Sequence, residues 1–143
     1  MSVKETRIIP LEEFILGNRK TARKRDEFVT GLIIPHPGKD ARGNFEKLGS
    51  RAFLVISIAM VGVVAKLNEY GEILNLNVAV GACSAVSQRL YLLEKEAKGQ
   101  KLKDLEIKPL HFENLEPIDD IRGTAAYRKA VISELVMRAV KGV

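Results

Sequence analysis

The chain has 143 residues and a formal net charge of +5, with 46% hydrophobic and 29% charged residues. This length suits a single domain with a buried core, and the modest positive excess permits an anionic partner without requiring one. One cysteine, Cys83, excludes an internal disulfide and a cysteine-based metal cluster, and His36 and His111 lack the spacing of metal ligands. The absence of tryptophan and the small number of aromatic residues argue against base stacking on nucleic acid.

Residues 6–10 (TRIIP) are a candidate strand, and residues 11–16 predict a short helix. Proline is tolerated at the start of a helix and glycine favours its end, which are the places of Pro10 and Gly17. We therefore expect a strand followed by one or two helical turns.

Residues 19–25 (RKTARKR) hold five basic side chains and no acidic one. This pattern fits either a solvated loop or a contact with phosphate or an acidic partner. Residues 28–34 (FVTGLII) predict another strand, which Pro35 would stop. Residues 35–43 (PHPGKDARG) predict a loop.

We interpret residues 51–82 as the central element of the fold, which the rest of the chain covers. Residues 52–65 are uncharged and rich in Val and Ile, which is typical of a strand buried on both faces, although a buried helix is the alternative. Residues 74–80 alternate apolar and small or polar side chains with a period of two, as in a strand with one buried face. Residues 68–71 (NEYG) fit the turn, so we predict a long antiparallel hairpin.

Residues 88–98 predict a helix that Ser87 would cap and Gly99 would end. Residues 101–110 predict a weaker helix or turn that is broken at Pro109.

The last predicted element is a helix that begins after Thr124, a favourable N-cap residue, and ends near Lys141. Glu134 and Arg138 are spaced for an exposed ion pair. Its apolar stripe consists of Val131, Ile132, Leu135, Val136, Ala139 and Val140. Taken together, the elements predict an α+β fold in which helices cover a small antiparallel sheet built on the central hairpin.

A membrane-spanning segment is not expected, because Lys66 closes the apolar run too early for a spanning helix. Lys4, Glu5 and Arg7 interrupt any signal-peptide pattern. We therefore expect a soluble, cytoplasmic protein.

The residues alone do not predict catalysis. Ser57 has no recognisable His and acid relay, and the glycines form no phosphate-binding loop. Cys83 fits a buried structural cysteine better than a reactive thiol. Asp119 and Asp120 are interpreted as residues that lead into the Thr124 cap. We name no catalytic residue and no metal ligand.

Three segments resemble the FAD-binding (medium) subunit of molybdenum hydroxylases, the carbon monoxide dehydrogenase and xanthine dehydrogenase family. Residues 45–51 (FEKLGSR) and then Ile56-Ser57 are similar to its aromatic-x-K-x-x-x-R and I-S segment. Residues 81–89, together with Glu94 and Gly99, resemble its next block, a G-A loop followed by R, E and G. Residues 118–128 (IDDIRGTAAYR) are close to its D-x-R-G-[ST]-x-x-Y-R motif.

The resemblance also implies a domain division and a fold. Residues 7–35 resemble the end of the flavin-binding domain of that subunit, so residues 1–36 are interpreted as the tail of that domain. Residues 37–143 are interpreted as a CO dehydrogenase flavoprotein C-terminal-like domain, an α+β fold.

In function, the resemblance implies that FAD lies between this domain and the preceding one. Electrons would arrive from an iron-sulfur subunit, originally from a substrate oxidised at a molybdenum-cofactor subunit, and leave to NAD or another acceptor. Lys47 matches a lysine beside the flavin, and Ile56 matches a residue on a strand that approaches the isoalloxazine ring. Arg51 either contacts the cofactor or forms a salt bridge where that strand starts. A lysine there would favour negative charge on a reduced flavin.

The chain also departs from the family pattern. Leu54 and Val55 stand where relatives often have acidic residues, and Ser87 stands where they often have proline. The glycine-rich segments that hold the FAD diphosphate in that family lie upstream of the residues present here, so we expect this chain alone to bind FAD weakly or not at all. The alternative function is a non-catalytic assembly module that kept the fold and lost the cofactor. Neither reading includes a nucleic-acid or membrane partner.

Overall fold

The computed structural model describes residues 5–143. They form two compact units, which divide between His36 and Pro37. Each unit is considered by itself.

The first unit is small and has little regular structure. Helix α1 (Leu11–Phe14) continues directly into strand β1 (Ile15–Gly17), which pairs antiparallel with β2 (Lys20–Thr21). The predicted helix over residues 11–16 is therefore confirmed only in its first four positions.

An ion pair stabilises the first unit. The Arg7 guanidinium donates from Nε and Nη2 to the two Glu27 carboxylate oxygens, each at 2.7 Å, and from Nη2 to the Ala22 carbonyl at 2.8 Å. These bonds from Arg7, followed by one from the Lys24 backbone N–H, lower the pKa of Glu27 to about 2. The bidentate pair thus joins two segments that lie 20 positions apart in the sequence.

The strands predicted over residues 6–10 and 28–34 are wrong, because neither segment forms a strand. In the second segment the apolar side chains are exposed, from 55% at Val29 to 83% at Ile34. Strand propensity reflects packing on a half-buried sheet surface, and these residues do not have that packing.

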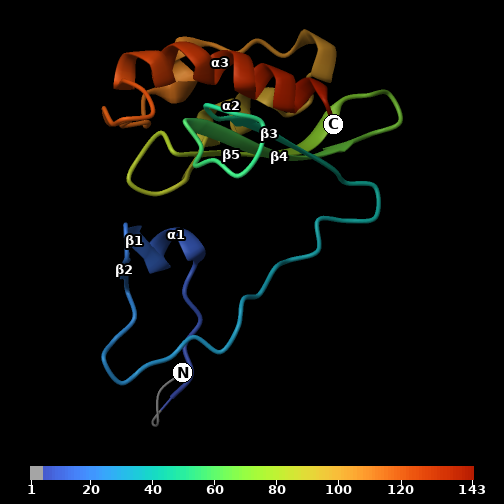
Figure 1. Ribbon diagram of the computed structural model, residues 1–143. Coiled ribbons are helices and arrows are strands. Elements are labelled where there is room, and N and C mark those ends of the chain that lie inside the picture. Colours follow the sequence, from blue (N-terminus) through green and yellow to red (C-terminus); the bar gives the residue numbers. More distant parts are fainter. Residues whose placement is uncertain (1–4) are drawn as a thin grey trace. The chain divides into compact units, whose positions relative to one another are not determined.

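The second unit is an antiparallel four-stranded sheet with helices on one face, which confirms the predicted α+β fold (Figure 1). The strand order is β3-β4-β5-β6. The strands are β3 (Arg42–Leu48), β4 (Ala59–Leu67), β5 (Ile73–Gly81) and β6 (Gln88–Arg89). Figure 1 shows α3 (Ala125–Lys141) and α2 (Tyr91–Ala97) on the same side of this sheet; α3 packs against β3 and β4, and α2 packs against β5.

The central hairpin is confirmed as β4 and β5. Val61 faces Val80 and Val63 faces Val78 across the ladder, and all four side chains are at most 2% exposed. Burial of each such side chain contributes roughly 1.5–3 kcal/mol. At the turn the Asn68 carboxamide oxygen accepts hydrogen bonds from the backbone N–H groups of residues 70 and 72, and Gly71 has a left-handed φ of 76°.

The first strand of the hairpin is shorter than predicted. Strand β4 begins at Ala59, whereas residues 51–58 form a bent loop. The prediction of a continuous strand through this stretch is wrong, and Ile56 lies on the loop. Lys47 lies on β3 opposite Met60.

Helix α3 agrees with its prediction. The Thr124 hydroxyl accepts a hydrogen bond from the Tyr127 backbone N–H at 3.1 Å, so the predicted N-cap is confirmed. The exposed pair between Glu134 and Arg138 is also present at 2.7 Å. The stripe is buried at Ile132, Leu135, Val136, Ala139 and Val140 and half-buried at Val131.

Helix α2 starts later than predicted. Gln88 and Arg89 pair with β5 as strand β6, and Leu90 occupies the N-cap, so the prediction that Ser87 caps this helix is wrong. Gly99, with a φ of 81°, follows its C-terminal end as expected. Two 3-10 turns follow, Leu102–Asp104 and Pro109–Phe112; the proline opens the second turn instead of breaking a helix.

Candidate functional site

The candidate site is the loop of residues 49–58, which joins β3 to β4. Its end is fixed at the sheet, because the Ile58 backbone N–H donates to the Leu48 carbonyl at 2.8 Å. Its start packs closely on its other half, because a Cβ on Gly49 would force the Val55 side chain to shift. Within the loop, Leu54 adopts a left-handed φ of 51°, which is uncommon for a residue with a side chain.

Two exposed cations hold the backbone of this loop. The Lys47 ammonium donates to the Val55 carbonyl at 2.7 Å, and the Arg51 guanidinium donates to the Leu54 carbonyl at 2.6 Å. Hydrogen bonds from charged donors are stronger than neutral ones. The two bonds therefore support the unusual backbone at Leu54 and set the position of Ile56 just beyond it.

The same loop presents large apolar side chains to solvent. Phe53 is 82% exposed, Leu54 is 93% exposed and Ile56 is 64% exposed. Large exposed apolar side chains on a backbone held by hydrogen bonds are typical of a surface that meets a partner or ligand.

The loop is anchored to the rest of the unit by Arg128 on α3. Its Nη1 donates to the Ile58 carbonyl at 2.5 Å and to the Ala82 carbonyl at 2.7 Å, and its Nη2 donates to the Asp120 carboxylate at 2.7 Å. The residue is only 2% exposed. One guanidinium thus joins the start of β4, the segment after β5 and the turn that precedes α3.

The carboxylate partner of Arg128 is stabilised in its charged form. Asp120 accepts a hydrogen bond from the Arg122 backbone N–H at 2.8 Å, and its side chain also pairs with the guanidinium groups of Arg122 and Arg128. These contacts, the backbone bond first, lower the pKa of Asp120 from 3.8 to about 2. The ion pair therefore persists through the neutral pH range.

The structure brings the three sequence-predicted site residues onto one short stretch. Lys47 and Arg51 bind the two carbonyls that immediately precede Ile56. The anchor itself, Arg128 with Asp120, was not predicted as part of the site. A signal existed, because Arg128 lies four residues before Ile132 and thus continues the buried stripe of α3.

The other chemistry-bearing residues do not form a reactive cluster. Ser57 donates to the Met60 thioether sulfur at 3.5 Å, which cannot serve as a base. Cys83 is a free, buried thiol whose pKa is raised by burial, as expected for a structural cysteine. Within residues 5–143, no group of three or more His, Cys, Asp or Glu side chains is arranged to hold a metal ion, and no helix is both long and apolar enough to cross a bilayer.

Comparisons with known proteins agree with this architecture. The family model described as CO dehydrogenase flavoprotein C-terminal domain matches residues 45–143. The nicotine 6-hydroxylase medium subunit of Paenarthrobacter nicotinovorans is 27% identical over 143 residues, which is 97% of this chain and 49% of that protein.

Two solved structures share the fold. Reconstituted CO dehydrogenase from Oligotropha carboxidovorans matches with a TM-score of 0.83 at 20% identity, over 97% of this chain and 49% of that chain. The cyanide-inactivated form of Cu,Mo-CO dehydrogenase matches with a TM-score of 0.85 at 23% identity, over the same shares of the two chains. This chain thus spans about half the length of the relatives that it matches.

Proposed function

We propose a function from the premise that this chain belongs to the CO dehydrogenase flavoprotein C-terminal domain family, whose model matches residues 45–143. The chain acts as the C-terminal part of the FAD subunit of a molybdenum hydroxylase-type oxidoreductase. It helps to form the flavin pocket, through which electrons pass from iron-sulfur centres to NAD or another acceptor. Its partners are an FAD-binding N-terminal portion, an iron-sulfur subunit and a molybdenum-cofactor subunit.

The observation that carries this proposal is the exposed apolar surface of the loop over residues 49–58. An isoalloxazine ring is flat and largely apolar at its faces, so Leu54 and Ile56, at 93% and 64% exposed, fit as a wall against it. Because a flavin pocket must be preorganised, the bonds from Lys47 and Arg51 to this loop support the same role.

Lys47 has a second role in the proposal. A lysine ammonium has three N–H donors, of which one is used on the Val55 carbonyl. A remaining donor and the positive charge would stabilise the negative charge that a reduced flavin develops. When bound, FAD supplies the redox chemistry, and this chain supplies the wall, the cation and the exclusion of water.

The proposed function also assigns each part of the chain to a domain. We infer that residues 1–36 are the end of the FAD-binding domain and that residues 37–143 are the C-terminal domain. The relatives are about twice as long as this chain, which supports a two-part flavin cleft. The substrate is set elsewhere in such an assembly.

A second candidate, a non-catalytic assembly module, is favoured by two hydrogen bonds. The Lys47 and Arg51 side chains both donate to carbonyls of the loop over residues 49–58, which is a sufficient structural reason for their presence. In this alternative the apolar loop meets a protein partner and no flavin.

Purification of the tagged chain from its own host distinguishes the two functions. The proposed function predicts a yellow complex with a flavin absorption spectrum, together with iron, molybdenum and two further subunits. A colourless complex that contains this chain and a protein partner, but no flavin, would support the assembly module.

A further inference from the structure

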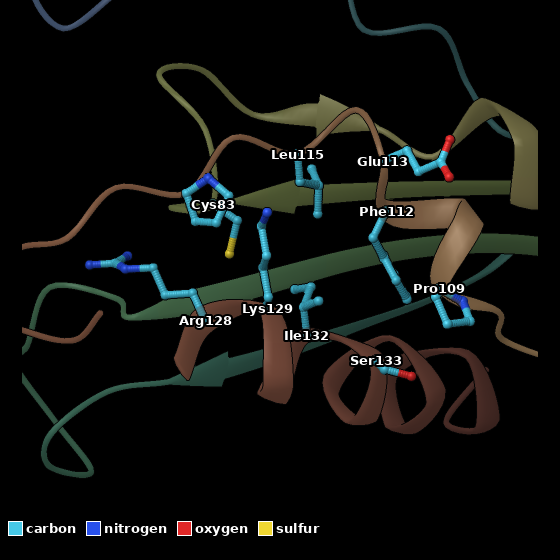
Figure 2. Close-up of a pocket in the computed structure, with 10 residues that line it drawn as sticks. Cys83, Pro109, Phe112, Glu113, Leu115, Arg128, Lys129, Ile132 and Ser133 are labelled. Atoms are coloured by element: carbon cyan, nitrogen blue, oxygen red, sulfur yellow. The ribbon is translucent and has the colours of Figure 1, made fainter. Parts of the chain in front are cut away.

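A partly open cavity of the second unit is distinct from the loop over residues 49–58, although Arg128 borders both. It has a volume of about 310 Å³ and lies between α3 and the segment of residues 109–117 (Figure 2). The residues that line it are Cys83, Pro109, Phe112, Glu113, Leu115, Pro117, Arg128, Lys129, Ile132 and Ser133. Lys47, Arg51 and Ile56 are not among them.

This cavity is preformed because its outer wall is fastened to neighbouring elements. The His111 ring accepts at Nδ1 from the Lys108 backbone N–H at 3.0 Å, and its Nε2 lies 3.2 Å from the Glu96 carboxylate on α2. Further along, the Glu116 backbone N–H donates to the Ser84 hydroxyl at 2.9 Å. A ligand would therefore meet a wall that is already in place, which lowers the entropic cost of binding.

The polar groups of the cavity favour an anion. Figure 2 shows the Lys129 side chain extending from α3 across the cavity, while the carboxylate of Glu113, which also lines the cavity, points away from Lys129. Lys129 is an exposed residue, so its ammonium is accessible from solvent. Within residues 5–143, the Lys129 ammonium has no ion-pair partner. Arg128 also lines the cavity, but Figure 2 shows its guanidinium directed away from Lys129, and its charge is paired with the Asp120 carboxylate. The cation available to a ligand is therefore Lys129.

The rest of the lining is apolar. Phe112, Leu115 and Ile132 supply aromatic and aliphatic walls, and Cys83 adds a buried thiol whose pKa is raised by burial. Apolar walls with a few polar groups are typical of small-molecule sites, and this volume is near the lower end of their range. A single ring fits such a space, whereas a dinucleotide such as FAD does not.

We propose that this cavity is a second binding site, for a small carboxylate with one apolar or aromatic ring. The carboxylate pairs with the Lys129 ammonium, and the ring lies against Phe112, Leu115 and Ile132. The site goes beyond the proposed flavin function and does not depend on it.

Benzoate is the probe that tests this site on the 143-residue chain. In a titration followed by ¹⁵N–¹H correlation spectra, we expect saturable shifts of the amides of residues 109–117 and 128–133. Benzamide, the neutral counterpart of similar shape, should bind about fivefold to tenfold more weakly, because it lacks the charge that Lys129 recognises.

Three variants make the test specific. Lys129→Gln should weaken benzoate binding by a similar factor and leave benzamide unchanged, whereas Lys95→Gln on the exposed side of α2 should alter neither. Ser133→Phe, at the half-buried rim, should fill the cavity and abolish both. The absence of saturable shifts in the folded wild-type chain, equal affinity for the two probes, or benzoate shifts that persist in Ser133→Phe would overturn the proposal.

Discussion

At the scale of single residues, Arg128 has the most consequences for the proposed flavin wall. It is almost fully buried, yet it satisfies two backbone carbonyls and one carboxylate from three different segments. Removal of a buried charged donor leaves its acceptors unpaired, which costs more than the hydrogen bonds themselves contribute. Arg128 is thus a positioning residue for the loop over residues 49–58 and has no direct role in chemistry.

Arg128→Met should destabilise the chain by about 2–4 kcal/mol, because it leaves the Ile58 and Ala82 carbonyls without this donor. Urea unfolding followed by far-UV circular dichroism measures this loss. The matched control is Arg138→Met on the same helix, where the lost exposed pair with Glu134 should cost only about 0.3–0.5 kcal/mol. Equal effects of the two substitutions would show that the buried network has no special importance.

The depressed pKa of Asp120 predicts a pH dependence of stability. Because its pKa is about 2 in the folded chain and 3.8 ordinarily, the folded state favours the charged form. The resulting stabilisation is complete above the ordinary pKa and is lost as the pH falls towards 2.

The difference in unfolding free energy between wild type and Asp120→Asn should therefore shrink as the pH is lowered through this window. The comparison with the variant is needed because Glu27 also has a pKa of about 2, so the wild-type curve contains both groups. A difference that stays constant down to the low end of the window would refute the assignment.

At the scale of elements, the sequence predicted those strands and helices whose position depends on a local pattern of residues. The alternation over residues 74–80 located β5, and the Thr124 cap with its apolar stripe located α3. The start of β4 could not be predicted, because the uncharged run over residues 52–65 has no period that separates strand from loop. The bend is fixed by bonds from Lys47 and Arg51 and by the Arg128 anchor, which are tertiary contacts.

Strand β3 was missed for a related reason. Its residues alternate between a face towards α3, where Asn44 donates to the Ala139 carbonyl at 3.1 Å, and an outer face with Phe45. Because both faces carry polar or charged residues, the alternation of apolar and polar side chains is weak. This edge strand forms because it pairs with β4, a contact that the local sequence pattern does not show.

Thr124→Ala should destabilise the second unit by roughly 1 kcal/mol, because the Tyr127 backbone N–H loses its acceptor at the start of α3. Thr124→Ser keeps the hydroxyl and should lie within a few tenths of a kcal/mol of wild type. Thermal unfolding of the three proteins gives the comparison. A serine variant as unstable as the alanine variant would mean that the threonine methyl group, and not the cap, is what matters.

At the scale of the whole molecule, the proposed flavin cleft is divided between two polypeptide portions. The sheet and α3 of the second unit hold an exposed apolar loop in a defined shape, and the proposal assigns the opposite wall of the flavin cleft to another portion. The candidate site residues could be named from the resemblance, since Lys47, Arg51 and Ile56 occupy motif positions. The hydrogen bonds from Lys47 and Arg51 to the Val55 and Leu54 carbonyls could not be predicted, because they depend on the bend at Leu54.

The flavin content of the purified complex after Ile56→Asp tests this division most directly. Ile56 is 64% exposed and makes little contact within the chain, so the substitution should leave folding intact and place a charge against the flavin ring. The control is Tyr70→Asp, at a residue that is 70% exposed in the turn at the opposite end of the hairpin. We expect Ile56→Asp to remove most of the FAD while Tyr70→Asp retains it. A complex that keeps its full FAD content with Ile56→Asp, or tight stoichiometric FAD binding by this chain alone, would contradict the account.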